Sequence, residues 1–165
     1  MERTLAESWR KHIPVDIQMR YEIIDRRHAA AILATEFTSQ FKEICEALRS
    51  FCFTDAQIKQ KGGSESEIPK SFSKILRPYP QDEDHPANWR VQKLTPKLIV
   101  RDEETGEEAI VSSDSHWIDY VKGRVATESE WNSKDQTFDR DLFAFRSFFD
   151  FGRIDLGILV RPAVG

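Results

Sequence analysis

Three acidic residues in the last third of the chain, Asp119, Glu128 and Glu130, combine oxygen ligands with a spacing that suits metal chemistry. Residues 124–131 are rich in β-prone side chains and predict a strand that carries both glutamates. Because successive side chains of a strand point to opposite faces, Glu128 and Glu130 share one face. The pattern predicts two carboxylates side by side on a sheet.

Asp119 belongs to a second predicted strand, residues 116–121, which is joined to the first by a tight turn centred on Lys122–Gly123. With the turn centred there, Asp119 lies opposite Ala126. Glu128 is then its diagonal neighbour, at roughly 7–8 Å between the two Cα atoms. We therefore expect the three acids to gather on one patch of the sheet.

Such a patch suits a divalent cation, because three like charges repel one another unless a cation neutralises them. An oxygen-only ligand set favours Mg²⁺, with Mn²⁺ as the alternative, over zinc. Acids at alternate strand positions are also common on solvent-exposed faces. The other face of this strand is only partly apolar, with Val125, Thr127, Ser129 and Trp131. Spacing alone therefore leaves a metal site and an exposed face both open.

The elements that must position these acids alternate between helices and strands. Apolar residues at spacings of three and four predict helices over 38–53 and 138–149, and two prolines bound a short helix over 69–76. Predicted strands cover residues 21–25, 89–94, 97–101, 109–111, 116–121, 124–131 and 154–160. We expect an α/β fold, with a mixed central β-sheet flanked by helices.

The helix predicted over 138–149 has two features that bear on the site. Asp139 and Asp141 fall in its first turn, where the helix dipole favours negative charge. One face carries four large apolar side chains, which indicate core packing or, in part, a dimer contact: Leu142, Phe145, Phe148 and Phe149. Further upstream, the acidic run over 102–108 predicts the exposed turn of a hairpin.

Length and composition restrict the class of protein. A chain of 165 residues suits one domain, and 39% apolar with 11% aromatic residues is too apolar for a disordered chain. The longest apolar run, residues 29–34, is far shorter than a bilayer-spanning helix, and residues 1–7 carry charges and no apolar leader segment. We expect a cytoplasmic protein without a membrane partner. The net charge of −4 argues against nucleic-acid binding through bulk positive charge.

The residues around the three acids resemble a known family. The run D-Y-V-K-G-R-V-A-T-E-S-E-W from Asp119, the Asp141–Leu142 pair and the I-D-L-G run at 154–157 are similar to motifs of Type II restriction endonucleases of the BglII and BstYI type. The close match covers about 40 residues. Residues 21–51 fit the family's first strand and helix loosely.

This resemblance implies a restriction-endonuclease-like fold of the PD-(D/E)xK superfamily. It also implies a homodimer that uses Mg²⁺ to hydrolyse double-stranded DNA at a short palindrome with a GATC centre. Asp119 and Glu128 match the metal-binding acids, and Glu130 completes the implied catalytic set. Glu130 departs from the lysine that is common in the wider superfamily, which leaves its role open between general base and metal ligand.

Residues next to the acids are candidates for binding DNA. Lys122 and Arg124 suit phosphates, or they offset the charge of the carboxylates. In the resembled enzymes, the loop after the catalytic strand approaches the major groove, where polar side chains pair with base edges. Its side chains here are Asn132, Ser133, Lys134 and Asp135. An ordinary loop leading into a helix is the alternative.

We expect a single endonuclease-like domain over residues 1–165, with a catalytic core at about 87–161 and a helical N-terminal part at about 16–78. The chain ends at Gly165, whereas the resembled enzymes continue with a further strand, so a compact relative and a C-terminally truncated fragment are both open. Two other functions also stay open. One is a catalytically inactive DNA-binding module of the same fold, and the other is an interaction domain with no nucleic-acid role.

Overall fold

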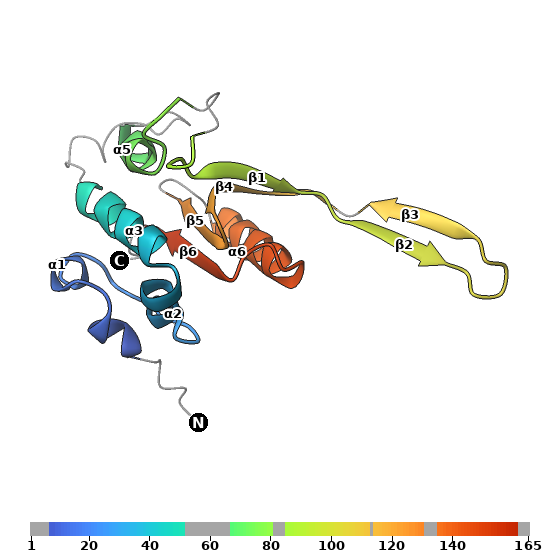
Figure 1. Cartoon of the computed structure of the whole chain (residues 1–165), viewed down its shortest axis with the longest axis horizontal. Helices are drawn as coiled ribbons and strands as arrows, with labels where there is room; N and C mark the ends of the chain where they lie inside the picture. Colours follow the sequence, from blue (N-terminus) through green and yellow to red (C-terminus); the bar gives the residue numbers. More distant parts are fainter. Residues whose placement is uncertain (1–6, 52–66, 81–84, 113, 131–134, 162–165) are drawn as a thin grey trace.

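The computed structural model describes residues 7–51, 67–80, 85–112, 114–130 and 135–161. They form a three-layer α/β body from which a hairpin projects (Figure 1). A four-stranded sheet is the middle layer, helices from the N-terminal half cover one face, and one long helix covers the other. None of the described helices is long and apolar enough to cross a membrane.

The helices pack through the apolar stripes that their sequences predict. The longest one on the first face buries Ile44, Cys45 and Ala47 at spacings of one to three residues. In chain order, the described helical segments are η1 (Ser8–Lys11), α1 (Val15–Gln18), α2 (Ala29–Glu36), α3 (Thr38–Ser50), α5 (Glu67–Leu76) and α6 (Asp135–Asp150).

The central sheet is mixed. Its strands, in spatial order, are β1 (Arg90–Leu94), β4 (His116–Lys122), β5 (Val125–Ser129) and β6 (Leu156–Val160). β1, β4 and β5 pair antiparallel, whereas β5 and β6 run parallel because α6 connects them across one face. Gly123, at φ +60°, accepts the left-handed conformation of the β4–β5 turn. This arrangement confirms the predicted α/β fold class.

Two apolar cores hold the layers together. On one face, Phe72 of α5 packs edge-on against Tyr120 of β4. On the other face, Phe145 and Phe148 of α6 pack against β4 and β5. α6 lies so close to β6 that a Cβ atom at Gly157 would be 2.9 Å from the Phe145 ring. Glycine at this position therefore sets the distance between the helix and the sheet.

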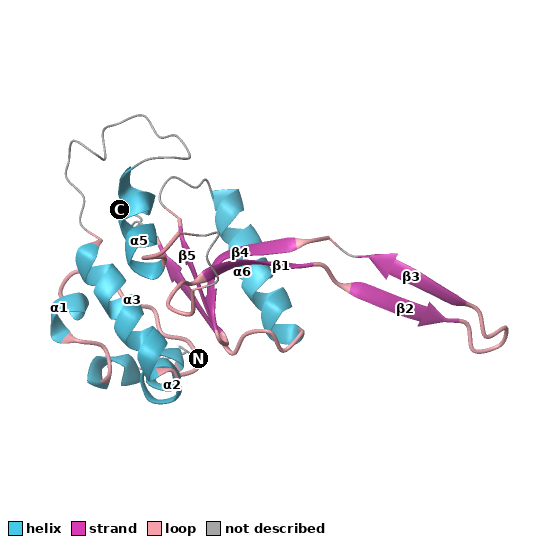
Figure 2. Cartoon of the chain, turned by 45° about the horizontal axis from the view of Figure 1, so that its top comes forward, coloured by secondary structure: helices cyan, strands magenta, loops and turns pink. Residues whose placement is uncertain are grey.

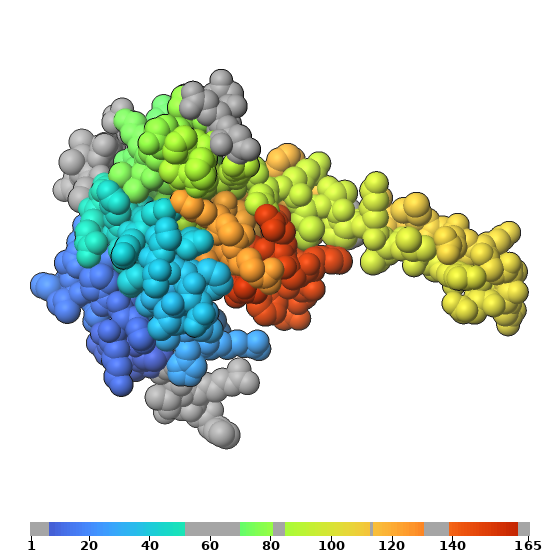
Figure 3. Space-filling view, in the orientation of Figure 1, coloured from blue at the N-terminus to red at the C-terminus, as the bar shows by residue number. Residues whose placement is uncertain are grey.

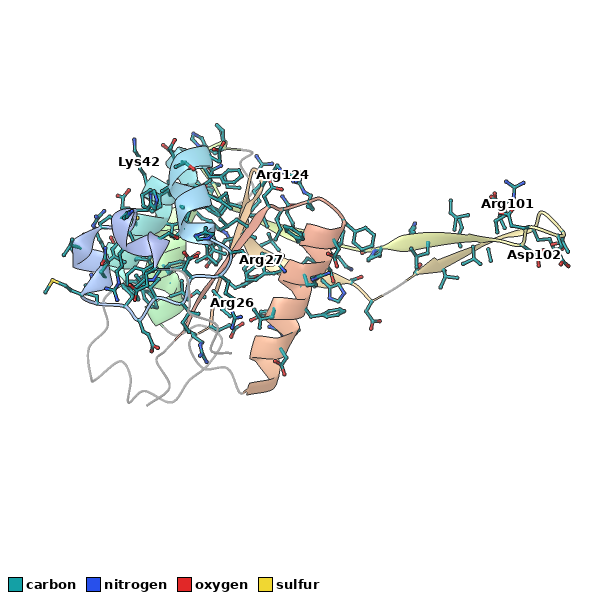
Figure 4. All side chains as sticks on the ribbon, turned by 90° about the horizontal axis from the view of Figure 1, so that it is seen from below. Arg26, Arg27, Lys42, Arg101, Asp102 and Arg124 are labelled. Atoms are coloured by element: carbon teal, nitrogen blue, oxygen red, sulfur yellow. The ribbon has the colours of Figure 1, made fainter. Side chains whose placement is uncertain are left out.

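The projecting hairpin is a separate two-stranded sheet of β2 (Lys97–Arg101) and β3 (Glu108–Ser112), seen on the right of Figure 2. We call residues 97–112 the arm. Each strand residue of the arm is exposed, and the space-filling view shows the arm standing clear of the body (Figure 3). The acidic turn predicted over 102–108 lies at its far end, where Figure 4 labels Arg101 and Asp102.

The strand predicted over residues 21–25 is wrong. These residues form an irregular segment in which Asp25 is buried. The Asp25 carboxylate accepts hydrogen bonds from the Ser8 hydroxyl and from the backbone N–H of Ala30, both at 3.3 Å. The segment therefore serves to lead the chain into α2.

The limits and the buried face of α6 also differ from the prediction. The helix begins at Asp135, three residues early, so Asp139 and Asp141 lie beyond its first turn. Phe145 and Phe148 are buried as predicted, but Leu142 and Phe149 are 44% and 50% exposed. The sheet covers a narrower stripe of the helix than the four-residue pattern indicates.

Candidate active site

β4 contains an extra residue near Asp119. Arg90 of β1 pairs with Val121, whereas Gln92 pairs with Ile118, so a two-residue step on β1 matches a three-residue step on β4. This β-bulge explains why Ile118 and Val121, three residues apart, pack into the same core. Bulges re-aim side chains and are common beside active sites.

The pairing of β4 with β5 differs from the predicted register. Val121, rather than Asp119, lies opposite Ala126, because the turn is centred one residue further along the chain than predicted. The backbone N–H of Asp119 donates a hydrogen bond to Glu128 Oε1 at 2.7 Å. The Glu128 side chain is therefore in direct contact with the Asp119 backbone, rather than a diagonal neighbour of Asp119.

Glu128 is a buried acid in a negatively charged setting, with only 6% of its surface exposed. Burial, and then the charge of Asp119, raises the pKa of Glu128 from 4.5 to about 8. Asp141 and Glu130 add smaller effects in the same direction, and the hydrogen bond from Asp119 N–H acts against them. A proton or a cation is what allows such a carboxylate to stay buried.

Sequence reasoning missed the contribution of Asp141 to this acidic cluster. Asp141 is 4% exposed, and its Oδ1 accepts hydrogen bonds from Arg140 at 3.1 and 3.2 Å. Its Oδ2 is buried and has no hydrogen-bond partner among the described residues. Arg140 also lies 3.6 Å from Glu130 Oε1. The Asp141–Leu142 pair was the sequence signal that could have revealed this role. Sequence reasoning instead placed Asp141 in the first turn of a helix and explained its charge by the helix dipole.

The oxygen ligands fit a hard divalent cation in kind, and the buried Oδ2 of Asp141 is the type of atom that such an ion satisfies. The described side chains do not meet the expectation of three acids around one ion. Among them, no group of three His, Cys, Asp or Glu is close enough to hold a metal. Mg²⁺ commonly takes one or two protein carboxylates, with waters and phosphates completing its shell. A site with Asp119 and Glu128 as its two protein ligands agrees with this preference of Mg²⁺.

Arg77, which follows α5, holds the backbone of the bulge. Its Nη2 donates a hydrogen bond to the carbonyl oxygen of Asp119, and its Nε donates to that of Trp89 at 3.3 Å. The guanidinium also lies 4.3 Å from the ring centre of Tyr120. The backbone N–H and the carbonyl oxygen of Asp119 thus both form hydrogen bonds outside the regular pairing between strands. No local sequence signal reveals this contact, because its partners are 42 residues apart.

The two predicted phosphate-binding cations have partners within the protein. Lys122 Nζ forms an ion pair with Glu43 Oε1 of α3 at 2.7 Å. Arg124, labelled in Figure 4, forms a two-pronged pair with Asp155 and donates to the carbonyl oxygen of Gly152 at 2.7 Å. Lys122 thus connects the end of β4 to α3, and Arg124 connects the β4–β5 turn to the segment before β6, while their contact with DNA stays a prediction.

The loop predicted to read bases falls mostly outside the description of the structure. Asn132, Ser133 and Lys134 are not among the described residues, and Asp135 is described only as the first residue of α6. Their role in DNA recognition stays a prediction.

Comparison with known proteins agrees with this fold. The family model described as restriction endonuclease BglII/BglIII matches residues 21–163. A search of curated proteins finds no match. The matched region includes the sheet, α6, the arm and the whole acidic cluster. Because the match covers most of the chain, the protein belongs to the BglII/BglIII family of restriction endonucleases.

Proposed function

We propose that the chain is an active Type II endonuclease that hydrolyses double-stranded DNA at a short, GATC-centred palindrome with Mg²⁺, or alternatively Mn²⁺. Membership of a restriction endonuclease family supports a nuclease that acts on DNA. One observation carries the finer proposal. A buried carboxylate, Glu128, is fixed by a hydrogen bond to the backbone of Asp119 in a bulged strand.

Asp119 and Glu128 are the residues that would hold the cation. When bound, the cation supplies polarisation of the scissile phosphate, a more acidic water and stabilisation of the leaving oxygen. Asp119 is exposed and is thus accessible to a DNA strand, whereas Glu128 is enclosed between the sheet and α6. The Asp119 N–H orients the Glu128 carboxylate without ordering a second side chain, because the donor is backbone.

Glu130 is the candidate general base. It lies two residues beyond Glu128, and Arg140, 3.6 Å away, orients its carboxylate. An ionised carboxylate in this position can accept the proton of an attacking water or add to the metal shell. The ionised form is the one that either role needs.

A palindromic target implies two copies of the protein, because each active site then meets one DNA strand. We therefore propose a homodimer. Lys122, Arg124 and the loop over 132–135 are the proposed DNA contacts. With a net charge of −4, the chain needs cations concentrated at such contacts to hold a phosphate backbone.

The test is cleavage of plasmid DNA with Mg²⁺ by the wild type, Asp119→Asn and the matched control Asp150→Asn. Asp150 is an exposed residue of α6 that pairs with Arg146. We expect discrete fragments from the wild type and the control, and a rate at least about 1,000-fold lower for Asp119→Asn. Retained duplex binding in Ca²⁺ would show that the variant is folded. Cleavage by Asp119→Asn at the wild-type rate would contradict the proposal.

A catalytically inactive DNA-binding module is the second candidate. The pairing of Arg140 with both Glu130 and Asp141 favours it, because this contact offsets acidic charge without a metal. This alternative predicts that the wild type shifts duplex DNA in Ca²⁺ but leaves plasmid uncut with either Mg²⁺ or Mn²⁺.

A further inference from the structure

Arg140 of α6 is a cation that contacts two acids of the cluster. Its guanidinium donates hydrogen bonds to Asp141 Oδ1 at 3.1 and 3.2 Å, and it lies 3.6 Å from Glu130 Oε1. The side chains of Asp141 and Glu130 are only 5% and 19% exposed, whereas that of Arg140 is 67% exposed. Arg140 therefore lies on the solvent side of the acids that it contacts.

A second ion pair on the same helix shows what an ordinary surface pair looks like. Arg146 lies 2.6 Å from Asp150, one helical turn away, and the two side chains are 70% and 46% exposed. Such pairs contribute little to stability, because water screens both charges. Asp141 is instead buried, and its Oδ2 has no hydrogen-bond partner among the described residues. A buried carboxylate of this kind needs a positive charge nearby.

The positive charge of Arg140 acts on the same acids that a metal ion would affect. Asp141 and Glu130 lie close enough to Glu128 that their negative charges help to raise its pKa. With a divalent cation on Asp119 and Glu128, the neighbouring acids would attract Arg140 less, and its guanidinium would be repelled. An exposed arginine loses little when it leaves such a partner, because water replaces the contact. Arg140 is thus a charge that can move.

We propose that Arg140 is a phosphate-binding catalytic residue, which Glu130 and Asp141 hold in place while the metal site is empty. When the metal ligands are occupied, its guanidinium turns to the scissile phosphate, where its forked N–H donors suit two phosphate oxygens. There it stabilises the negative charge that develops in the transition state. Its departure also frees the Glu130 carboxylate to act as base. This inference rests on the proposed nuclease function and names a further residue for that reaction.

Metal binding without DNA tests whether Arg140 and the metal compete for the same acids. The measurement is calorimetric titration of the wild type, Arg140→Gln and Arg140→Lys with Mg²⁺. Removal of the competing cation should lower the Mg²⁺ Kd of Arg140→Gln at least about threefold, whereas Arg140→Lys keeps the charge and should stay within about twofold of the wild type. The matched control Arg146→Gln removes an equally exposed arginine from α6 and should leave the Kd unchanged.

DNA binding tests the phosphate contact without cleavage. In excess Ca²⁺, the plot of log K against log salt for a short GATC-centred duplex should be shallower by about one for Arg140→Gln than for the wild type, because one phosphate contact is lost. In EDTA the two slopes should agree, because Glu130 and Asp141 then hold Arg140. Arg146→Gln should keep the wild-type slope in both solutions. Near-UV circular dichroism checks that each variant is folded.

Cleavage of plasmid DNA in saturating Mg²⁺ completes the test. Arg140→Gln should cut at least about 100-fold more slowly than the wild type although it binds Mg²⁺ more tightly, and Arg140→Lys should recover part of the rate. A purely structural role would not tighten metal binding while it slows cleavage.

Three results would overturn the role of Arg140. Arg140→Gln would bind Mg²⁺ no more tightly than the wild type, keep the wild-type salt slope in Ca²⁺, or cut plasmid at the wild-type rate. A wild type that binds Mg²⁺ and duplex DNA but leaves plasmid uncut would instead contradict the nuclease function itself, and the catalytic role of Arg140 with it.

Discussion

Replacing Glu128 with glutamine tests whether an ionised carboxylate at this buried position destabilises the folded protein. Glutamine keeps an oxygen that can accept the Asp119 N–H hydrogen bond, but it carries no charge at any pH. A pKa raised from 4.5 to about 8 corresponds to roughly 5 kcal/mol at about 1.4 kcal/mol per pH unit. This is an upper bound, because water penetration and local relaxation reduce it.

The sign of the effect follows from proton binding. Between pH 4.5 and 8, the folded wild type holds a proton on Glu128 that the unfolded chain has lost. The contribution of Glu128 to stability is therefore full below pH 4.5 and is lost as the pH rises through 8. Glu128→Gln should match the wild type near pH 4.5 and exceed it by about 3–5 kcal/mol at pH 8.5.

The assay is urea unfolding followed by tryptophan fluorescence, in EDTA, at half-unit steps from pH 4.5 to 8.5. The control is Glu103→Gln, at an exposed acid of the arm tip, whose free energy of unfolding should follow that of the wild type at every pH. If the free energies of unfolding of Glu128→Gln and the wild type change in parallel with pH, the reasoning is refuted. A gap that widens toward acid pH would refute it as well.

Three further predictions follow from the same structure. Mg²⁺ at ten times its Kd should stabilise the folded wild type by about 1.4 kcal/mol and should not stabilise Glu128→Gln. The stabilisation should be larger at pH 8.5 than at pH 6, because the Glu128 carboxylate must lose its proton to bind the ion. Thermal unfolding checks this prediction, and an equal shift of the unfolding temperature in both proteins would contradict it. Gly157→Ala should cost about 1–3 kcal/mol, because its methyl group meets the Phe145 ring, and an unchanged urea midpoint would count against that contact. In urea unfolding at low protein concentration, Phe148→Ala should lower the free energy of unfolding by about 3–5 kcal/mol, and Phe149→Ala, at an exposed position, by less than about 1 kcal/mol. Similar losses in the two variants would mean that the buried face of α6 is misassigned.

Local patterns in the sequence predict much of the fold. β-Prone residues predict the strand that carries Glu128, although Glu130 lies one residue beyond its end, and a glycine at residue 123 marks the hairpin turn. Both features depend on residues that are close in sequence. The same reasoning identifies the acidic hairpin tip, because charged residues there interrupt two apolar runs.

What the sequence could not predict depends on contacts between distant segments. The bulge at Asp119 arises from the pairing of β4 with β1, and Arg77 reaches it across 42 residues. A one-residue error in the predicted turn placed Asp119 opposite Ala126, whereas Val121 lies there and the Asp119 backbone contacts the Glu128 carboxylate. Asp141 joins the acids because α6 packs against β4 and β5, which is a contact between segments far apart in the sequence. The strands of the arm were predictable, but their separation from the body was not.

The most direct test of the account is sequencing of the DNA ends that the wild type produces from genomic DNA with Mg²⁺. The account predicts that the ends map to one short palindrome, carry 5′-phosphates, and are absent from a parallel reaction with Asp119→Asn. Ends scattered at random, or an identical set of ends from both proteins, would contradict it.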